Sequence, residues 1–126
     1  MPDIEVRSSS RSEMIDITEQ VSDILEDGHT ALLISSPHTT CGITVNEGYD
    51  PAVQEDMLAK LDDLVPQETW FRHSEGNSDA HIKTSLIGTS QLIPLRDGKL
   101  ALGRWQRIFL AEFDGPRTRN VRIEMM

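Results

Sequence analysis

Residues 92–102 read Leu-Ile-Pro-Leu-Arg-Asp-Gly-Lys-Leu-Ala-Leu and give the strongest local indication of the fold class. Two apolar segments, 92–95 and 100–102, flank Asp97-Gly98, a dipeptide that favours the tight turn of a β-hairpin. We therefore expect two antiparallel strands joined at this turn.

Alternation of apolar and polar residues predicts further strands on both sides of the hairpin. These candidate strands cover residues 3–9, 30–36, 38–48, 105–113 and 120–125. The apolar run 31–34 predicts a strand buried on both faces. Cys41 belongs to the apolar face of the strand at 38–48, so we interpret it as a small buried residue and not as a nucleophile.

Apolar residues at helical spacing predict helices over residues 17–25, 50–64 and 80–87. Asp50-Pro51 is a typical helix start, with aspartate as the N-cap and proline in the first turn. In the last helix we expect Ile82 and Leu86 to face the core. The elements together predict one α+β domain over residues 1–126, with a largely antiparallel sheet and two to three helices.

Size and charge limit the classes of function. A chain of 126 residues is expected to form a single domain, and its one cysteine excludes an intramolecular disulfide. A net charge of −9 repels a phosphodiester backbone, so we expect no nucleic-acid partner. We find neither an apolar run of membrane-spanning length nor the pattern of a signal peptide, and we expect a cytoplasmic protein without a membrane partner.

Residues 73–88 concentrate reactive side chains in one polar loop and one short helix. His73 lies in the loop and His81 at the start of the helix, while His38 follows a predicted strand. Three neutral imidazoles form a typical set of ligands for a divalent metal such as zinc, with a position left open for substrate. Magnesium is the alternative ion, and histidines that only hydrogen-bond their loops are the alternative to any metal.

His81 is also a candidate catalytic residue. A helix start disfavours a protonated imidazole, and a neutral ring can accept a proton. Lys83 and Ser85 lie within one turn of His81, and the helix start offers unpaired N–H groups. This combination suits a phosphate or a carboxylate, so we expect a small anionic metabolite as the ligand.

Glu112 follows Ile108 and Leu110 on one face of a predicted strand. A buried carboxylate needs a partner, which favours either a catalytic role beside a histidine or metal, or a structural ion pair with Arg119 or Arg107.

Several motifs, in this order along the chain, resemble the YjbQ family, which is identified with secondary thiamine-phosphate synthase. They are His38-Thr39-Thr40, Asn46-Glu47, Asp50-Pro51, Glu75-Gly76, Ala80-His81-Ile82-Lys83 with Ser85, Ile93-Pro94, Gly98, and Leu102-Gly103-Arg104-Trp105-Gln106. The family usually has threonine where this chain has Arg104, a difference at the rim of the expected site.

The resemblance implies a small α+β domain, a homotrimer, and a polar site around His38, His73 and His81 with zinc as the candidate ion. It also implies a weak transferase activity that condenses hydroxymethylpyrimidine pyrophosphate with thiazole phosphate. The expected catalytic residues are His81, Glu112, Lys83 and Ser85. The expected substrate-binding residues are Thr39, Thr40, Asn46, Glu47, Arg104, Trp105 and Gln106. A turn role is an equal alternative for Asn46 and Glu47.

Two other classes of function remain open at the level of sequence. The histidines and Glu112 are compatible with a metal-dependent hydrolase or lyase of a small phosphorylated metabolite. The absence of a clear nucleophile is compatible with a module that binds such a metabolite without turnover.

Overall fold

The computed structural model describes residues 3–126 and confirms the α+β class. Its elements are β1 (Asp3–Arg7), β2 (Glu13–Asp16), α1 (Thr18–Asp23), β3 (Ala31–Ser35), β4 (Cys41–Glu47), α2 (Pro51–Leu64), α3 (Ser78–Ile87), β5 (Ser90–Arg96), β6 (Lys99–Leu100), β7 (Gln106–Glu112) and β8 (Thr118–Met125).

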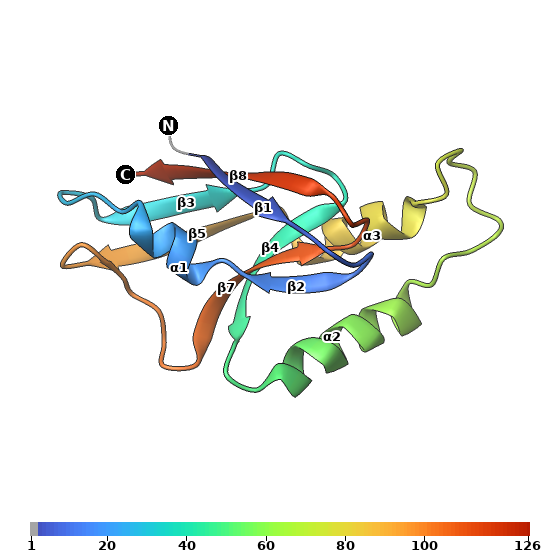
Figure 1. The fold of residues 1–126 in the computed structure, drawn as a ribbon, viewed down its shortest axis with the longest axis horizontal. Coiled ribbons are helices and arrows are strands. Elements are labelled where there is room, and N and C mark those ends of the chain that lie inside the picture. The colour runs from blue at the N-terminus through green and yellow to red at the C-terminus, as the bar shows by residue number, and fades with distance from the viewer. Residues whose placement is uncertain (1–2) are drawn as a thin grey trace.

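The strands form two sheets in which every pairing is antiparallel (Figure 1). One sheet has the order β1-β8-β3-β5-β6, and the other has the order β2-β7-β4. The predicted hairpin is confirmed, since Arg96 pairs with Lys99 across the turn. Asp97 and Gly98 have φ angles of 52° and 75°, the left-handed values that this tight turn requires.

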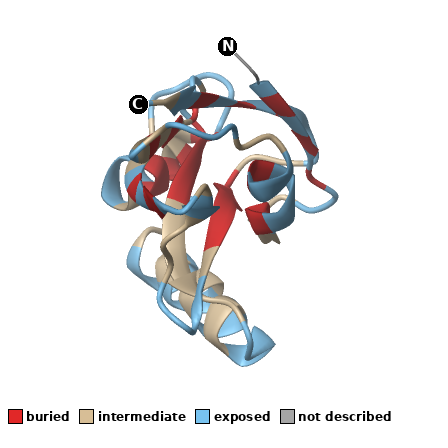
Figure 2. Ribbon diagram, turned by 90° about the vertical axis from the view of Figure 1, so that its left-hand side faces the viewer, coloured by how far each residue is buried: buried red, intermediate tan, exposed pale blue. Residues whose placement is uncertain are grey.

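The apolar core lies between the two sheets (Figure 2). Alternate residues of β1 and β8 enter it, such as Ile4 and Val121. The prediction that β3 is buried on both faces is wrong. Only Leu32 and Ile34 are buried, and the side chains between them are partly exposed. An antiparallel sheet needs cover on one face only, which agrees with the alternating burial of β3.

Helix α3 presents a different face to the core from the one predicted. Ile82 is 40% exposed and Leu86 is 62% exposed, whereas Asp79 and Lys83 are each 1% exposed. The inward charges are paired: Arg11 donates two hydrogen bonds to Asp79, and the Lys83 amine contacts Asp62 of α2. These partners turn Asp79 and Lys83 inward and leave Ile82 and Leu86 outside.

Helix α2 begins as predicted, because the Asp50 side chain accepts a hydrogen bond from the Ala52 N–H at 3.0 Å. The helix has no buried residue (Figure 2). Leu58 and Leu61 nevertheless pack beside side chains of α3, β2 and β7. None of the helices described in residues 3–126 is long and apolar enough to cross a membrane.

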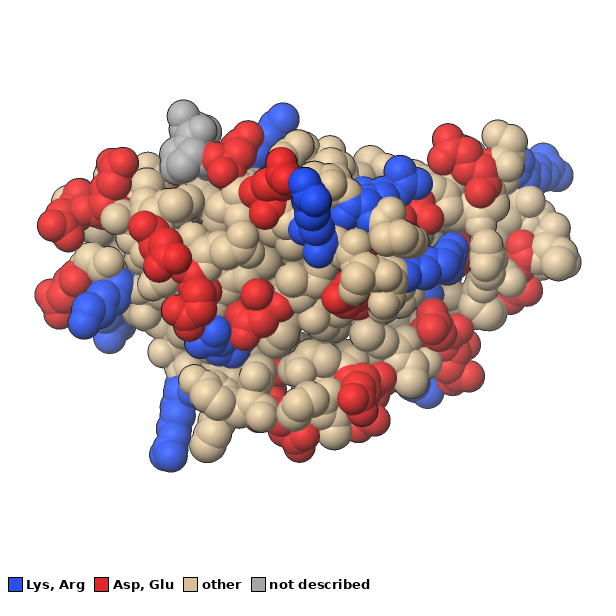
Figure 3. Space-filling view, viewed as in Figure 1, with Lys and Arg blue, Asp and Glu red and all other residues tan. Residues whose placement is uncertain are grey.

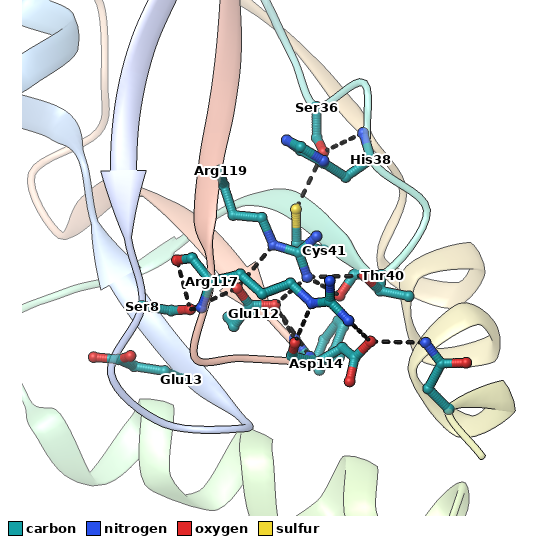
Figure 4. Close-up of polar contacts among 12 residues, drawn as sticks. Ser8, Glu13, Ser36, His38, Thr40, Cys41, Glu112, Asp114, Arg117 and Arg119 are labelled. Carbon is teal, nitrogen blue, oxygen red and sulfur yellow. Dashed lines mark hydrogen bonds and ion pairs between the residues drawn. The ribbon is translucent and has the colours of Figure 1, made fainter. Parts of the chain in front are cut away.

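A buried ion pair joins the two sheets at one end of the core (Figure 4). Glu112 ends β7 of one sheet, and Arg119 lies on β8 of the other. The guanidinium donates to both carboxylate oxygens, at 2.8 Å for Nε to Oε1. Ser8 also donates to Glu112, and Arg119 donates to the Thr40 hydroxyl at 2.8 Å. The pair is therefore satisfied on both sides, as a buried charge pair requires.

This arrangement lowers the pKa of Glu112. Burial alone would raise that pKa, but the hydrogen bonds from Arg119 and Ser8 together with the positive charge of Arg119 outweigh burial. The pair therefore contributes its full stability above the ordinary carboxyl pKa of 4.5. That contribution is lost as the pH falls through the lower pKa of the folded state.

Removal of the arginine tests the importance of this pair. We expect Arg119→Met to lower the free energy of unfolding by about 3–5 kcal/mol, because it leaves the Glu112 carboxylate buried without its partner. Arg122→Met is the matched control, since Arg122 lies on the same strand and is exposed. The control should change the free energy of unfolding by no more than about 0.5 kcal/mol in urea denaturation at pH 7. Equal losses in the two variants would contradict this role of the pair.

Candidate functional site

Two open clefts adjoin each other beside α3. The first has a volume of about 520 Å³, and His38, Thr84 and Ser85 are among the residues that line it. The second has a volume of about 320 Å³ and is lined by Thr40, His73, Glu75, Asn77, Asp114 and Arg117. Thr39 and His81 line both clefts. We call the two clefts together the histidine groove.

His38 is held by a hydrogen bond from the backbone. The Asn120 N–H donates to Nε2 of His38 at 3.0 Å. An N–H group can only donate, so Nε2 must be the unprotonated acceptor, and the proton of the neutral ring lies on Nδ1. Within residues 3–126 no hydrogen bond engages Nδ1 of His38. His38 therefore presents an N–H donor in a fixed tautomer.

The surroundings of His38 favour its neutral form. Burial lowers the pKa of His38, and the positive charge of Arg119 lowers it further, against a weaker opposing effect of Glu112. The folded protein thus takes up a proton on this ring at a lower pH than the unfolded chain does. Any stability that His38 contributes is present above its ordinary pKa of 6.5 and declines as the pH falls below it.

His73 and His81 form a second pair of rings. Their ring centroids lie 5.5 Å apart in a T-shaped arrangement. Nε2 of His73 lies 3.9 Å from a carboxylate oxygen of Glu75. His81 belongs to the first turns of α3, as predicted, and is partly buried. His81 lines both clefts.

The three histidines do not fit the three-imidazole metal site that the sequence predicts. Residues 3–126 contain no group of three or more histidine, cysteine, aspartate or glutamate side chains placed to hold an ion. A neutral imidazole that binds a metal through Nδ1 carries its proton on Nε2, where His38 already accepts the Asn120 N–H. A metal bound to His38 would have to displace the hydrogen bond from Asn120. Zinc and magnesium remain predictions from the sequence.

Two buried side-chain oxygens, on residues that line the groove, have no hydrogen-bond partner within the described chain. They are Oγ1 of Thr84, in the first cleft, and Oδ1 of Asn77, in the second. Both residues are more than nine-tenths buried. The amide nitrogen of Asn77 donates to Asp114 at 2.7 Å, which fixes its oxygen as the unpaired atom. Buried oxygens without a partner are uncommon in folded proteins, and these two belong to residues on either side of His81 along the groove.

Arg117 supplies a positive charge to the second cleft. Its guanidinium is 3.0 Å from a carboxylate oxygen of Asp114, and its Nε donates to the Asp114 carbonyl at 2.7 Å (Figure 4). Three further N–H groups of the guanidinium stay available for an anionic ligand. Sequence reasoning did not select Arg117, Asn77 or Thr84. Asn77 could have been found from its place at the start of α3.

Two of the predicted catalytic residues lie outside the groove. The Lys83 amine is turned away from both clefts and is buried between Asp62 and Asp79. Glu112 is fully buried in its ion pair with Arg119, the structural alternative for this residue. Ser85 does line the first cleft, where its hydroxyl donates to the His81 carbonyl at 3.0 Å.

The remaining predicted residues lie at the opposite end of the three-stranded sheet. Antiparallel pairing of β4 with β7 places Cys41 beside Glu112 and Glu47 beside Gln106. Six residues of a strand separate these two positions, a distance of about 20 Å. Within one chain, Asn46, Glu47 and Gln106 therefore do not reach the histidines.

Local contacts occupy the side chains at this far end. The Glu47 carboxylate accepts from the N–H groups of Tyr49 and Asp50, and Asn46 accepts from the N–H of Glu47. These are the turn contacts that the sequence left open as an alternative. Arg104 stacks on the Trp105 ring at 4.7 Å, and Gln106 accepts from the Gly103 N–H.

Comparison with known proteins relates the whole chain to one family. Residues 2–126 match the family described as UPF0047 protein YjbQ-like. The UPF0047 protein YugU of Bacillus subtilis is 49% identical, over 98% of this chain and 96% of its own length. The UPF0047 protein MJ1081 of Methanocaldococcus jannaschii is 45% identical, over 97% of this chain and 91% of its own.

Solved structures agree with this relationship. A crystal structure of a YjbQ/UPF0047 family protein from Clostridium acetobutylicum superposes with a TM-score of 0.96 at 42% identity, and each chain is covered completely. A conserved hypothetical protein of Thermus thermophilus superposes with a TM-score of 0.95, also at 42% identity and with complete coverage.

The tautomer of His38 can be measured directly. In long-range proton–nitrogen NMR spectra at pH 7.5, we expect Nδ1 to be protonated and Nε2 to be an unprotonated acceptor. Because the pKa is lowered, the ring should stay neutral on acidification until the pH is below the ordinary value of 6.5. His38→Gln identifies the signals by their loss. A proton found on Nε2 would contradict the hydrogen bond from Asn120.

Proposed function

Because the chain belongs to the UPF0047 family of YjbQ-like proteins, we propose that its histidine groove binds small phosphorylated metabolites and condenses them to thiamine phosphate. The proposed substrates are hydroxymethylpyrimidine pyrophosphate and thiazole phosphate. The resemblance of the chain's motifs to the family supports this choice of reaction, and the polar groups of the groove support the class of ligand.

The unpaired oxygens of Asn77 and Thr84 carry the proposal of a binding groove. The first is an acceptor only, and the second can either donate or accept. Both atoms are closed to solvent, so a ligand that lies across both clefts, past Thr39 and His81, would reach them after a shift of the Asn77 and Thr84 side chains. Pyrimidine rings with amino substituents have donors for the amide oxygen, and phosphate oxygens are acceptors for the hydroxyl.

The proposed reaction needs hydrogen-bond donors more than it needs a base. The ring nitrogen of the thiazole already carries a lone pair and forms the new C–N bond. The C–O bond to pyrophosphate breaks, and the departing oxygen takes the electron pair. The main demand on the protein is to stabilise negative charge on the leaving group, which preorganised donors do well.

The groove has donors suited to this task. The Nδ1–H of His38 is fixed by the hydrogen bond on the other side of its ring. Arg117 contributes N–H groups to the second cleft, and His81 lies between the two clefts. We assign the binding of the leaving pyrophosphate to His38, His81 and Arg117. No proton has to leave the attacking nitrogen in this scheme.

Binding without turnover is the second candidate. The hydroxyl of Ser85 donates to a backbone carbonyl and not to a histidine, so it lacks the adjacent base that activates a serine nucleophile. This favours a sensor of a phosphorylated metabolite over a hydrolase that forms a covalent intermediate. Saturable binding of either substrate with no product would identify this function.

We propose in addition that the chain assembles as a homotrimer, as its family resemblance implies. Three large apolar side chains on the consecutive elements α3 and β5 are exposed: Ile82, Leu86 and Leu92, the last at 64%. Exposed apolar side chains gathered on neighbouring elements are typical of a protein interface. Such an interface would lie beside the first cleft, because Ser85 and Gly88 line that cleft.

An assay with two histidine variants tests the proposed activity. With both purified substrates, we expect product formation to fall about a hundredfold in His81→Ala, the size of loss typical for one group that stabilises charge in a transition state. His29→Ala is the matched control, since His29 lies in the loop before β3 and lines no part of the groove. Activity that is equal in the two variants would place the reaction elsewhere or assign it to a contaminant.

Light scattering tests the proposed assembly. We expect a mass three times the 14.2 kDa of one chain, and a single chain's mass for Leu86→Glu, because a carboxylate is costly to bury in an apolar interface. Leu64→Glu is the control, since Leu64 is equally exposed, at 61%, but lies on α2. A wild-type mass of one chain would refute the trimer, and loss of assembly in both variants would refute this choice of surface.

A further inference from the structure

A third pocket lies at the end of β7 that is remote from the histidine groove. Its volume is about 380 Å³, a size that suits a small molecule. It shares no lining residue with either cleft of the groove. Residues of α1, of β6 and of the loop between β6 and β7 surround it, together with Tyr49.

Positive charge is concentrated at this pocket. The chain has only 12 lysine and arginine residues against 21 aspartate and glutamate residues, and acidic side chains are spread over the face seen in Figure 3. Three of the 12 cations, Lys99, Arg104 and Arg107, line this one pocket. An acidic protein that places a quarter of its cations around one concavity creates a local field of the opposite sign there.

Two of the three charges are not neutralised within the described chain. Arg107 donates to Asp16 at 2.8 Å and to Glu19 at 3.0 Å, so two carboxylates fully offset its single positive charge. Glu19 is the one carboxylate among the described lining residues of the pocket, and Arg107, which it shares with Asp16, partly offsets its charge. Neither Lys99 nor Arg104 forms an ion pair with any residue from 3 to 126.

Contacts within the chain hold the mouth of this pocket in shape. Arg104 stacks on the ring of Trp105, and Tyr49 packs edge-on against the same ring at 5.5 Å. Gln106 accepts the Gly103 N–H at 2.7 Å and so fixes the loop that carries Arg104. The guanidinium is thereby held near one orientation, which reduces the entropy lost when it binds a ligand.

We infer that this pocket is a second anion-binding site, for a ligand that carries a phosphoryl group. The two unpaired cations would bind the negative charge, and the hydroxyls of Ser22 and Tyr49 line the same pocket as further donors. Together they offer more donors than the two oxygens of a carboxylate can use, whereas a phosphoryl group has three oxygens and nearly two charges. The inference does not depend on the function proposed for the histidine groove.

Pyrophosphate is the probe for this site. In proton–nitrogen correlation spectra of the full chain at low ionic strength, we expect saturable shifts of the Lys99, Gly103 and Arg104 amide signals. Lys99→Ala/Arg104→Ala should weaken that binding at least about tenfold, the loss expected for two charge-assisted contacts. The same spectra show whether each variant is folded. Arg104→Gln, which keeps a polar side chain, should give a smaller loss in the same direction.

Arg7→Ala/Arg122→Ala is the matched control. It removes two exposed arginines of the larger sheet and gives the same net charge as the test variant. We expect its pyrophosphate affinity to stay within about twofold of the wild type, since distant exposed charges are screened by salt. Equal weakening in both double variants would show that only net charge matters. Shifts that do not saturate, or that are confined to the groove, would also overturn the inference.

Discussion

The Glu112–Arg119 pair is the interaction on which both the fold and the histidine groove depend. It is the buried polar contact that joins β7 of one sheet to β8 of the other. Arg119 also holds Thr40, which lines the groove, and its chain neighbour Asn120 donates to His38. The position of β8 relative to β4 thus sets both the tautomer of His38 and one wall of the groove. A substitution that breaks the Glu112–Arg119 pair would therefore also alter the histidine groove.

Local patterns predicted much of the fold, because the forces behind them are local. The Asp97-Gly98 turn, the Asp50 cap and the alternation in β1 and β8 each depend on residues close together in the chain. Helix α3 was assigned the wrong inward face for the opposite reason. The partners that bury Asp79 and Lys83 are Arg11 and Asp62, which lie 68 and 21 residues away. No periodicity in residues 80–87 contains that information.

The candidate site was predictable in its residue types but not in its extent. The sequence indicated His38, His73 and His81 together, and the fold places all three along the two adjoining clefts. It could not indicate that Asn46 and Gln106 lie at the far end of β4 and β7, because the register between two strands follows from the whole sheet. The unpaired oxygens of Asn77 and Thr84 were equally hidden, since an unpaired atom is known only when all its neighbours are known.

The sheet order β1-β8-β3 has a consequence for how the protein is made. Strand β8 is synthesised after the other strands described in residues 3–126, yet it lies between β1 and β3 and pairs with both. Until it is synthesised, β1 and β3 have open edges, and Arg119 cannot neutralise Glu112. The sheet therefore closes only after β8 has emerged, and until then the nascent chain exposes strand edges that are prone to mispairing. The interval before β8 emerges is the stage at which a chaperone would matter most for this protein.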